Sequence, residues 1–188
     1  MEPRSTELDR TSIVSYARNN FNKRKPESGN GIVPYYDFSQ IPGNYDCTNF
    51  VSHALLAGGA TVYDTGNPAT GWYYWDLSNR SYSWSGVINL YDFLINNDIK
   101  GPSGRGIPYD VFNKNEEKPY EIGDILQFHN GQVWRHSTII TGFYYVNRNN
   151  IGALVTGRTS PKSYNNNQKA ANIYRGAAKR VIKLGLNY

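Results

Sequence analysis

The order of two apolar patterns constrains the fold of this chain more than any other feature. Up to about residue 100, apolar residues recur at the three- and four-residue spacing of amphipathic helices. After residue 120 they form short strand-like runs separated by Asn- and Gly-containing turns. Helices followed by strands favour an α+β domain with an antiparallel sheet over a parallel sheet. The chain of 188 residues is long enough to bury a core, so we predict a single domain over residues 1–188.

Local signals place the predicted elements along the chain. Thr6 and Asp9 resemble a capping box ahead of the first helix, and residues 1–7 are expected to form a flexible N-terminal extension. Gly58 and Gly59 end the second helix. The predicted helices run from the Thr6/Asp9 signal to Phe21, from Cys47 to Ala57, and from Ser83 or Ser85 to Gly101-Pro102; the predicted strands cover residues 124–128, 136–145 and 151–156, with a closing strand near Val181.

Cys47 is the only cysteine, and it lies where a loop becomes the second helix. A lone thiol forms no internal disulfide, and the spacing of a redox or zinc site is missing. The N-terminus of a helix carries a partial positive charge that stabilises a thiolate. A small buried hydrophobe is the competing interpretation. Because Asp46 and Thr48 are polar, we expect Cys47 to be half exposed and nucleophilic.

A thiol nucleophile needs a base, and the chain offers three histidines. His53 lies six residues after Cys47 on the same helix, which places it about 9 Å along the axis and about 240° around it. His129 falls in a predicted exposed turn. His136 starts a strand that can hold an imidazole against a helix end, so we predict His136 as the base, with a structural histidine as the alternative. Metal ligands are scattered rather than clustered, and we expect no metal or cofactor.

Charge is unevenly distributed between the two parts of the chain. Residues 125–188 contain nine Lys or Arg and no carboxylate, whereas residues 1–124 contain eleven basic and fifteen acidic residues, giving +9 and −4. Such a basic segment favours a polyanionic partner, or is simply a soluble face. No nucleic-acid-binding motif is recognisable, so we expect no nucleic acid but allow an anionic cell-wall polymer. No apolar stretch suits a membrane span, and Met1 to Arg4 are not followed by a secretory signal.

Several motifs occur together and in order: Asp46-Cys47-Thr48-Asn49-Phe50-Val51-Ser52-His53-Ala54-Leu55, then Ala57-Gly58-Gly59; the helix from Leu8-Asp9-Arg10 to Phe21; Trp72-Tyr73-Tyr74 and Ser83-Trp84; Gly123-Asp124-Ile125-Leu126-Gln127-Phe128; and Trp134-Arg135-His136-Ser137-Thr138-Ile139-Ile140-Thr141. With these motifs the chain resembles the bacterial putative amidase domain family. That family is similar to papain-like, NlpC/P60 and CHAP cysteine peptidases and amidases.

The resemblance implies an α+β, papain-like (NlpC/P60-like) domain with N-terminal helices packed on an antiparallel sheet. It also implies a cysteine-dependent amidase or peptidase with Cys47 as nucleophile and His136 as general base. The backbone N–H of Cys47 and the side chain of Tyr45 are expected at the oxyanion hole. The implied substrate is a peptidoglycan-related peptide or muropeptide, and the implied location is secreted or associated with the cell wall.

One position departs from the family pattern. Such relatives usually carry a His, often with a later Asp, on the strand after the base, whereas this chain has Arg158 there and no carboxylate downstream. Arg accepts no hydrogen bond, so the Nδ1–H of His136 needs another acceptor. Thr156, an Asn of residues 165–167 and a backbone carbonyl are the candidates, and Thr156 is our assignment as third catalytic residue. The departure leaves open a catalytically weak or inactive module that binds anionic cell-wall polymer or a protein partner.

Substrate-binding residues are harder to predict because aromatic side chains either line a groove or fill the space between helices. We expect substrate or oxyanion contacts from Tyr45, Asp46, Asn49, Trp72, Trp84 and Arg158.

Overall fold

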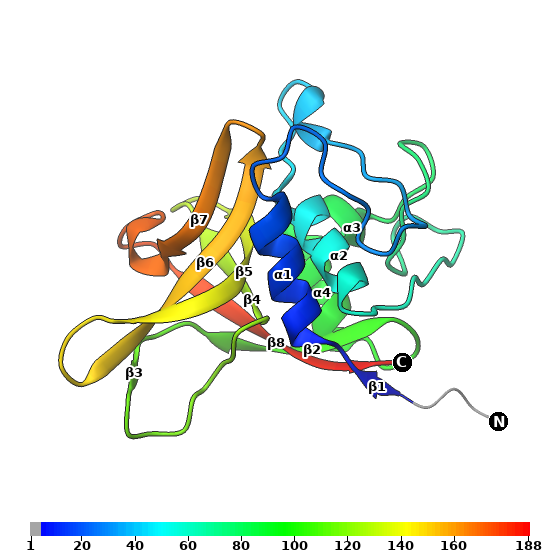
Figure 1. Cartoon of the computed structure of the whole chain (residues 1–188). Coiled ribbons are helices and arrows are strands. Elements are labelled where there is room, and N and C mark those ends of the chain that lie inside the picture. Colours follow the sequence, from blue (N-terminus) through cyan, green and yellow to red (C-terminus); the bar gives the residue numbers. More distant parts are fainter. Residues whose placement is uncertain (1–4) are drawn as a thin grey trace.

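The computed structural model describes residues 5–188, which form four α-helices and one eight-stranded antiparallel sheet (Figure 1). The predicted α+β class with an antiparallel sheet is confirmed. None of the helices in the described part of the chain is long and apolar enough to cross a lipid bilayer. The elements are β1 (Thr6–Glu7), α1 (Arg10–Asn20), α2 (Cys47–Ala57), α3 (Tyr82–Ser85), α4 (Val87–Asn96), β2 (Pro102–Pro108), β3 (Phe112–Asn113), β4 (Ile125–His129), β5 (Trp134–Tyr145), β6 (Asn150–Ser160), β7 (Ser163–Lys169) and β8 (Lys179–Asn187), with short 3-10 turns at Phe38–Gln40 and Ala170–Asn172.

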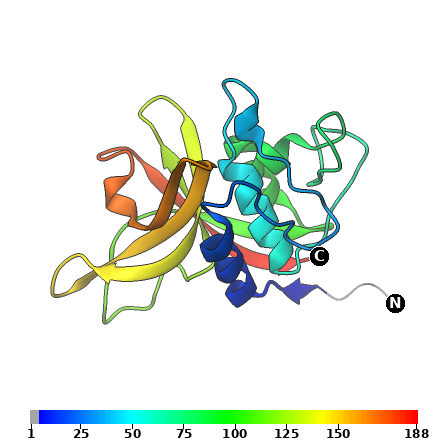
Figure 2. The ribbon, with the colours of Figure 1, turned by 45° about the horizontal axis from the view of Figure 1, so that its top comes forward.

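The sheet brings the second half of the chain against the helices of the first half. Its strand order is β1-β8-β4-β5-β6-β3, with β2 also paired to β8 and β7 to β6. Helices α1 and α2 pack against β5 and β6, and α4 packs against β2 and β8. The two ribbon views show the helices gathered beside one part of the sheet, while the yellow end of the β5–β6 hairpin extends away from them (Figures 1 and 2). The N-terminus of α2 therefore meets the start of β5.

Both faces of the central strands are buried, which explains their continuous apolar runs. Ile125 and Ile139 lie opposite each other on β4 and β5 and belong to the core shared with the helices. The next residues, Leu126 and Ile140, point to a second core on the other face. Alternate side chains of a strand point to opposite faces, so each strand contributes to both cores.

The helices agree with the predictions in part. Helix α2 spans Cys47–Ala57, as predicted. The capping-box prediction was wrong, because Asp9 itself caps α1 by accepting hydrogen bonds from the N–H groups of Thr11 and Ser12. The predicted third helix is interrupted at Gly86, whose extended backbone separates α3 from α4.

The predicted strands correspond to β4, β5, β6 and β8. The two-residue strands β1 and β3 were missed, and so were the longer strands β2 and β7. Asn and Gly are unfavourable in strands, and these two segments gain their structure from pairing with β8 and β6. The flexible extension predicted for residues 1–7 was wrong for Thr6 and Glu7, which pair with Asn187 and Leu186. Residues 1–4 lie outside the described part of the chain.

A buried ion-pair cluster joins the sheet to the start of α2. The guanidinium of Arg158 on β6 lies 2.9 Å from the carboxylate of Asp37 and, through Nε, 2.8 Å from that of Asp46. It also donates to the backbone carbonyl of Lys23 at 2.7 Å. The backbone N–H of Asp46 donates to the carbonyl of Thr159 at 3.0 Å. The cluster thus fixes the residue before Cys47 against β6.

We expect Arg158→Met to destabilise the fold. Removing one partner of a buried ion pair leaves uncompensated charge, here on Asp37 and Asp46, and costs about 3–5 kcal/mol. Urea unfolding at pH 7 measures the change, with Arg148→Met on the exposed β5–β6 turn as the matched control. A loss within about 0.5 kcal/mol, as for ordinary surface substitutions, would contradict the assigned role of the cluster.

Candidate active site

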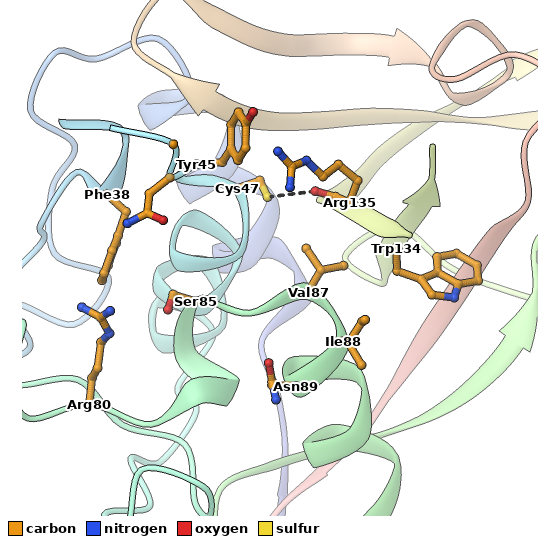
Figure 3. Close-up of a pocket in the computed structure, with 12 residues that line it drawn as sticks. Phe38, Tyr45, Cys47, Arg80, Ser85, Val87, Ile88, Asn89, Trp134 and Arg135 are labelled. Carbon is orange, nitrogen blue, oxygen red and sulfur yellow. Dashed lines mark hydrogen bonds between the residues drawn. The ribbon is translucent and has the colours of Figure 1, made fainter. Parts of the chain in front are cut away.

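Cys47 and His136 come together although 89 residues separate them (136 − 47). Cys47 is the first residue of α2, and His136 is the third residue of β5, against which α2 packs. Both side chains line one small cavity of about 70 Å³. Cys47 is only 3% exposed, so the expectation of a half-exposed thiol was wrong. It nevertheless also lines a larger cavity of about 300 Å³, in which Figure 3 shows its sulfur beside Arg135.

The two side chains stabilise each other's charged forms. Burial raises the pKa of the Cys47 thiol, but the neighbouring imidazole of His136 and its charge, the N–H of Ser137 and the Thr48 hydroxyl lower it, and the net pKa falls below 9.0. Burial lowers the pKa of His136, whereas the neighbouring thiol of Cys47 and its thiolate charge, together with Asn165, raise it, and the net pKa rises above 6.5. Opposite shifts of this kind favour a thiolate–imidazolium pair.

Asn165 on β7 orients the imidazole. The Nε2–H of His136 donates to Oδ1 of Asn165 at 2.7 Å, which leaves Nδ1 for the thiol. The amide of Asn165 is itself held, because its Nδ2 donates to Oε1 of Gln168 at 2.7 Å. Asn165 is one of the acceptors that the sequence allows, but the sequence analysis expects an acceptor for the N–H at Nδ1. In the structure the nitrogen that donates to this acceptor is Nε2.

Within residues 5–188 the hydroxyl of Thr156 makes no hydrogen bond to the imidazole, so its assignment as third catalytic residue was wrong. Its hydroxyl pairs with that of Thr141 at 2.8 Å and accepts the backbone N–H of Asn167 at 3.1 Å. Arg158 is not a substrate-binding residue either, because it is fully buried in the ion-pair cluster. Arg158 lies at the position where relatives usually carry a histidine. Its ion pair with Asp46 holds the start of α2 in place, and it does not orient His136.

A chain of polar side chains leads from the half-buried Arg180 to Cys47 and was not predicted. Nε of Arg180 donates to Oε1 of Gln127 at 2.9 Å, and Nε2 of Gln127 donates to Oγ of Ser137 at 3.1 Å. The hydroxyls of Ser137 and Thr48 lie 3.1 Å apart, and that of Thr48 lies 3.8 Å from the sulfur of Cys47. Strands β8, β4 and β5 are thereby linked to the start of α2.

Most predicted substrate contacts belong to the core instead. Trp72 and Trp84 are fully buried with their rings 4.8 Å apart, and their indole N–H groups donate to Ser52 and Asn49. Asp46 is also fully buried; burial raises its pKa to about 6, against hydrogen bonds from Tyr35 and Asn49 and the charge of Arg158. Asp46, Asn49, Trp72 and Trp84 line none of the three cavities that residues 5–188 form at Cys47 and His136, so their prediction as substrate-binding residues was wrong.

Tyr45 is the one predicted substrate-binding residue that lines both cavities at Cys47. The other residues that line the larger cavity come from the loop before α2, the segment before α3, the α3–α4 junction and the start of β5, and only tertiary structure brings them together. Trp134 and Arg135 directly precede His136 in the sequence, and this adjacency was the signal that could have identified them as lining residues. The larger cavity is lined by Phe38, Gly43, Asn44, Tyr45, Cys47, Arg80, Ser85, Val87, Ile88, Asn89, Trp134 and Arg135.

The other two histidines lie away from the thiol. His53 is fully buried, and its Nδ1 accepts the N–H of Gly29 at 3.0 Å. Burial lowers the pKa of His53 to about 3, so this ring stays neutral at physiological pH. His129 ends β4, rather than lying in an exposed turn, and its Nδ1 accepts the N–H of Gly131. Within residues 5–188, no three His, Cys, Asp or Glu side chains gather as metal ligands.

The backbone N–H of Cys47 lies at the first position of α2. The first N–H groups of a helix have no partner inside the helix, and Phe50 is the first residue whose N–H bonds back, to the carbonyl of Asp46. This leaves the N–H groups of the first turn directed out of the helix end. Such amides can stabilise a negative oxygen that forms next to the sulfur.

The pKa shifts predict the pH dependence of thiol alkylation. Because the net pKa of Cys47 is lowered, thiolate should form, and iodoacetamide should react, with a midpoint below pH 9.0. In His136→Ala only burial and weaker hydrogen bonds remain, so the midpoint should move up. His129→Ala is the control and should keep the native midpoint. Equal midpoints for native protein and His136→Ala would contradict the pairing.

Comparison with known proteins agrees with the sequence resemblance at the level of the family. A stretch of 93 residues, 50% of this chain, is 36% identical to the "Uncharacterized protein YhbB" of Bacillus subtilis (strain 168) and covers 26% of that protein. No solved structure matches the chain. Residues 7–183 match the family model described as "Putative amidase domain", which covers nearly all of the chain. The chain therefore belongs to this amidase domain family.

Proposed function

We propose that this domain is a cysteine-dependent amide hydrolase with Cys47 as nucleophile and His136 as general base. One observation carries the proposal: a thiol at a helix start and an imidazole held by Asn165 line the same cavity and favour each other's charged forms. Membership of an amidase domain family supports amide hydrolysis as the reaction. The proposed mechanism needs no metal or cofactor.

The reaction follows from these positions. The thiolate of Cys47 adds to the amide carbonyl carbon, and the carbonyl electron pair moves to an oxygen that the helix-start N–H groups stabilise. The imidazolium of His136 gives its proton to the departing nitrogen as the C–N bond breaks, which releases the amine and leaves a thioester. Water then adds to the thioester while His136 takes its proton. Cleavage of the C–S bond releases the acid and restores the dyad.

We also propose a papain-like fold, related to NlpC/P60 and CHAP domains. Its support is the arrangement of three parts: a cysteine at the start of a helix, a histidine on the adjacent strand, and an amide oxygen on the far side of the imidazole. A peptidoglycan-related peptide or muropeptide is the proposed substrate, and a secreted or cell-wall-associated protein is the proposed setting. Both rest on the family resemblance.

We expect Cys47→Ala and His136→Ala each to abolish hydrolysis of muropeptides. The first removes the nucleophile and the second removes the proton carrier, and loss of either member of such a dyad costs nearly all catalysis. Mass spectrometry of defined muropeptides detects the products. His129→Ala is the control and should retain most activity, since its ring bonds only locally. An inactive His129→Ala beside an active His136→Ala would refute the assigned base.

Asn165→Ala should lower kcat without changing the fold. The imidazole would lose its acceptor on Nε2 and its fixed orientation, and loss of an orienting partner costs about ten- to a hundredfold. Thr156→Val keeps the volume and removes a hydroxyl that bonds to Thr141 rather than to the imidazole, so it should retain most activity. A larger loss in Thr156→Val than in Asn165→Ala would reverse the assignment.

The burial of the thiol favours a second candidate, a module that binds wall polymer or a protein partner without cleaving it. At 3% exposure Cys47 meets solvent only through the cavities that it lines. The alkylation measurement separates the candidates. Fast reaction near neutral pH supports the hydrolase, whereas a native thiol that resists iodoacetamide supports the binding module.

A further inference from the structure

The cavities around the dyad carry one sign of charge. Three adjoining cavities contain Cys47 or His136, and within residues 5–188 none has a carboxylate in its lining. Their charged lining residues, apart from the histidine, are Arg80 and Arg135. Asp46 is near in sequence but is buried outside the cavities and paired with Arg158. Apart from Cys47 and His136, the charged side chains of the cavity linings are therefore all positive.

Arg135 holds its charge next to the sulfur. Its guanidinium lies 4.1 Å from the centre of the Tyr45 ring, and both residues line the two cavities that contain Cys47. Its backbone carbonyl accepts from the thiol at 3.9 Å. Figure 3 shows the guanidinium above the sulfur, between Tyr45 and the start of β5. Stacking on an aromatic ring leaves the N–H groups of Arg135 available to a ligand.

Arg80 supplies a second charge in the larger cavity. Its guanidinium lies 4.7 Å from the centre of the Phe38 ring and makes one hydrogen bond, to the carbonyl of Leu77 at 3.2 Å. In Figure 3 it lies on the opposite side of the cavity from Trp134. Neither Arg80 nor Arg135 forms a salt bridge within the described part of the chain. Both guanidinium groups thus lack an anionic partner.

We infer that Arg135, assisted by Arg80, binds a carboxylate of the substrate next to the amide that Cys47 attacks. Arg is the side chain best suited to paired hydrogen bonds with a carboxylate, and such charge-assisted bonds are about twice as strong as neutral ones. Val87, Ile88 and Trp134 give the same cavity an apolar surface that suits the hydrocarbon part of an acidic residue. This inference names the substrate class of the proposed hydrolase and rests on that function.

The thiol itself provides a probe that needs no substrate. Iodoacetate and iodoacetamide alkylate the same sulfur but differ in charge, so the ratio of their rates reports the charge beside Cys47. Arg135→Gln should lower the iodoacetate to iodoacetamide ratio by about fivefold, the effect of one charge at about 4 Å in water. Arg80→Gln should lower it less. Arg148→Gln, on the exposed β5–β6 turn, controls for net charge and should leave the ratio unchanged.

Peptide pairs test the same inference with a substrate. One pair contains Glu or Gln beside the scissile amide, and the other carries a free or an amidated C-terminus, which distinguishes a side-chain carboxylate from a terminal one. The native enzyme should prefer the acid by about tenfold or more in kcat/KM, as expected for a hydrogen-bonded charge. Arg135→Gln should lose this preference, chiefly by a rise in KM for the acid relative to the amide.

The outcomes separate the inference from the proposed function. Two outcomes would overturn the inference but leave the proposed hydrolase intact. One is cleavage of the acid and the amide peptides at equal rates. The other is an iodoacetate to iodoacetamide rate ratio that is the same in Arg135→Gln as in Arg148→Gln. If no peptide is cleaved, calorimetry can still measure how tightly the Cys47→Ala protein binds the acid and the amide of each pair, and this comparison tests the carboxylate site. Binding of the acid about tenfold tighter than the amide supports the carboxylate site, and equal binding refutes it.

Discussion

The pairing of Asp46 with Arg158 is the interaction on which the arrangement of the site depends. It joins the last residue before α2 to the middle of β6, two segments that lie 112 residues apart (158 − 46). Because Asp46 and Arg158 are both fully buried, neither charge has water as an alternative partner. The carboxylate of Asp46 also accepts the N–H of Phe38 and the amide of Asn49. The start of α2, and with it the thiol, is held to the sheet by charge rather than by apolar packing alone.

Cys47 and His136 show the same balance between the cost of burying a charge and the gain from pairing it. Desolvation acts against both charged forms, raising the pKa of Cys47 and lowering that of His136. Each group offsets this cost of burial mainly through the other. The amide of Asn165 also favours the charged imidazole, and the hydroxyl of Thr48 also favours the thiolate. A nearly enclosed thiol is thus compatible with the proposed reactivity, because the pairing that compensates its burial would also activate it.

The sequence predicted those parts of the site that local pattern determines. The bounds of α2, the class of the fold and the central strands follow from helical spacing, glycine stops and apolar runs. Asn165 could not be selected, since it lies on an Asn-rich strand that forms only through its pairing with β6. Arg158 was misread for a related reason: its partners Asp37 and Asp46 come from a loop whose path no local pattern specifies. Trp72 and Trp84 illustrate that aromatic residues alone do not distinguish a groove from a core.

The location of Asn165 has a consequence for the dyad at elevated temperature. Strand β7 pairs only with β6 within the described residues, whereas β5, which carries His136, is bordered by strands on both sides. Edge segments with a single neighbour open locally at lower free energy than the core does. Fraying of β7 would release the imidazole while the two cores stay packed. The alignment of Cys47 and His136 would then be lost at a lower temperature than the fold of the domain that carries them.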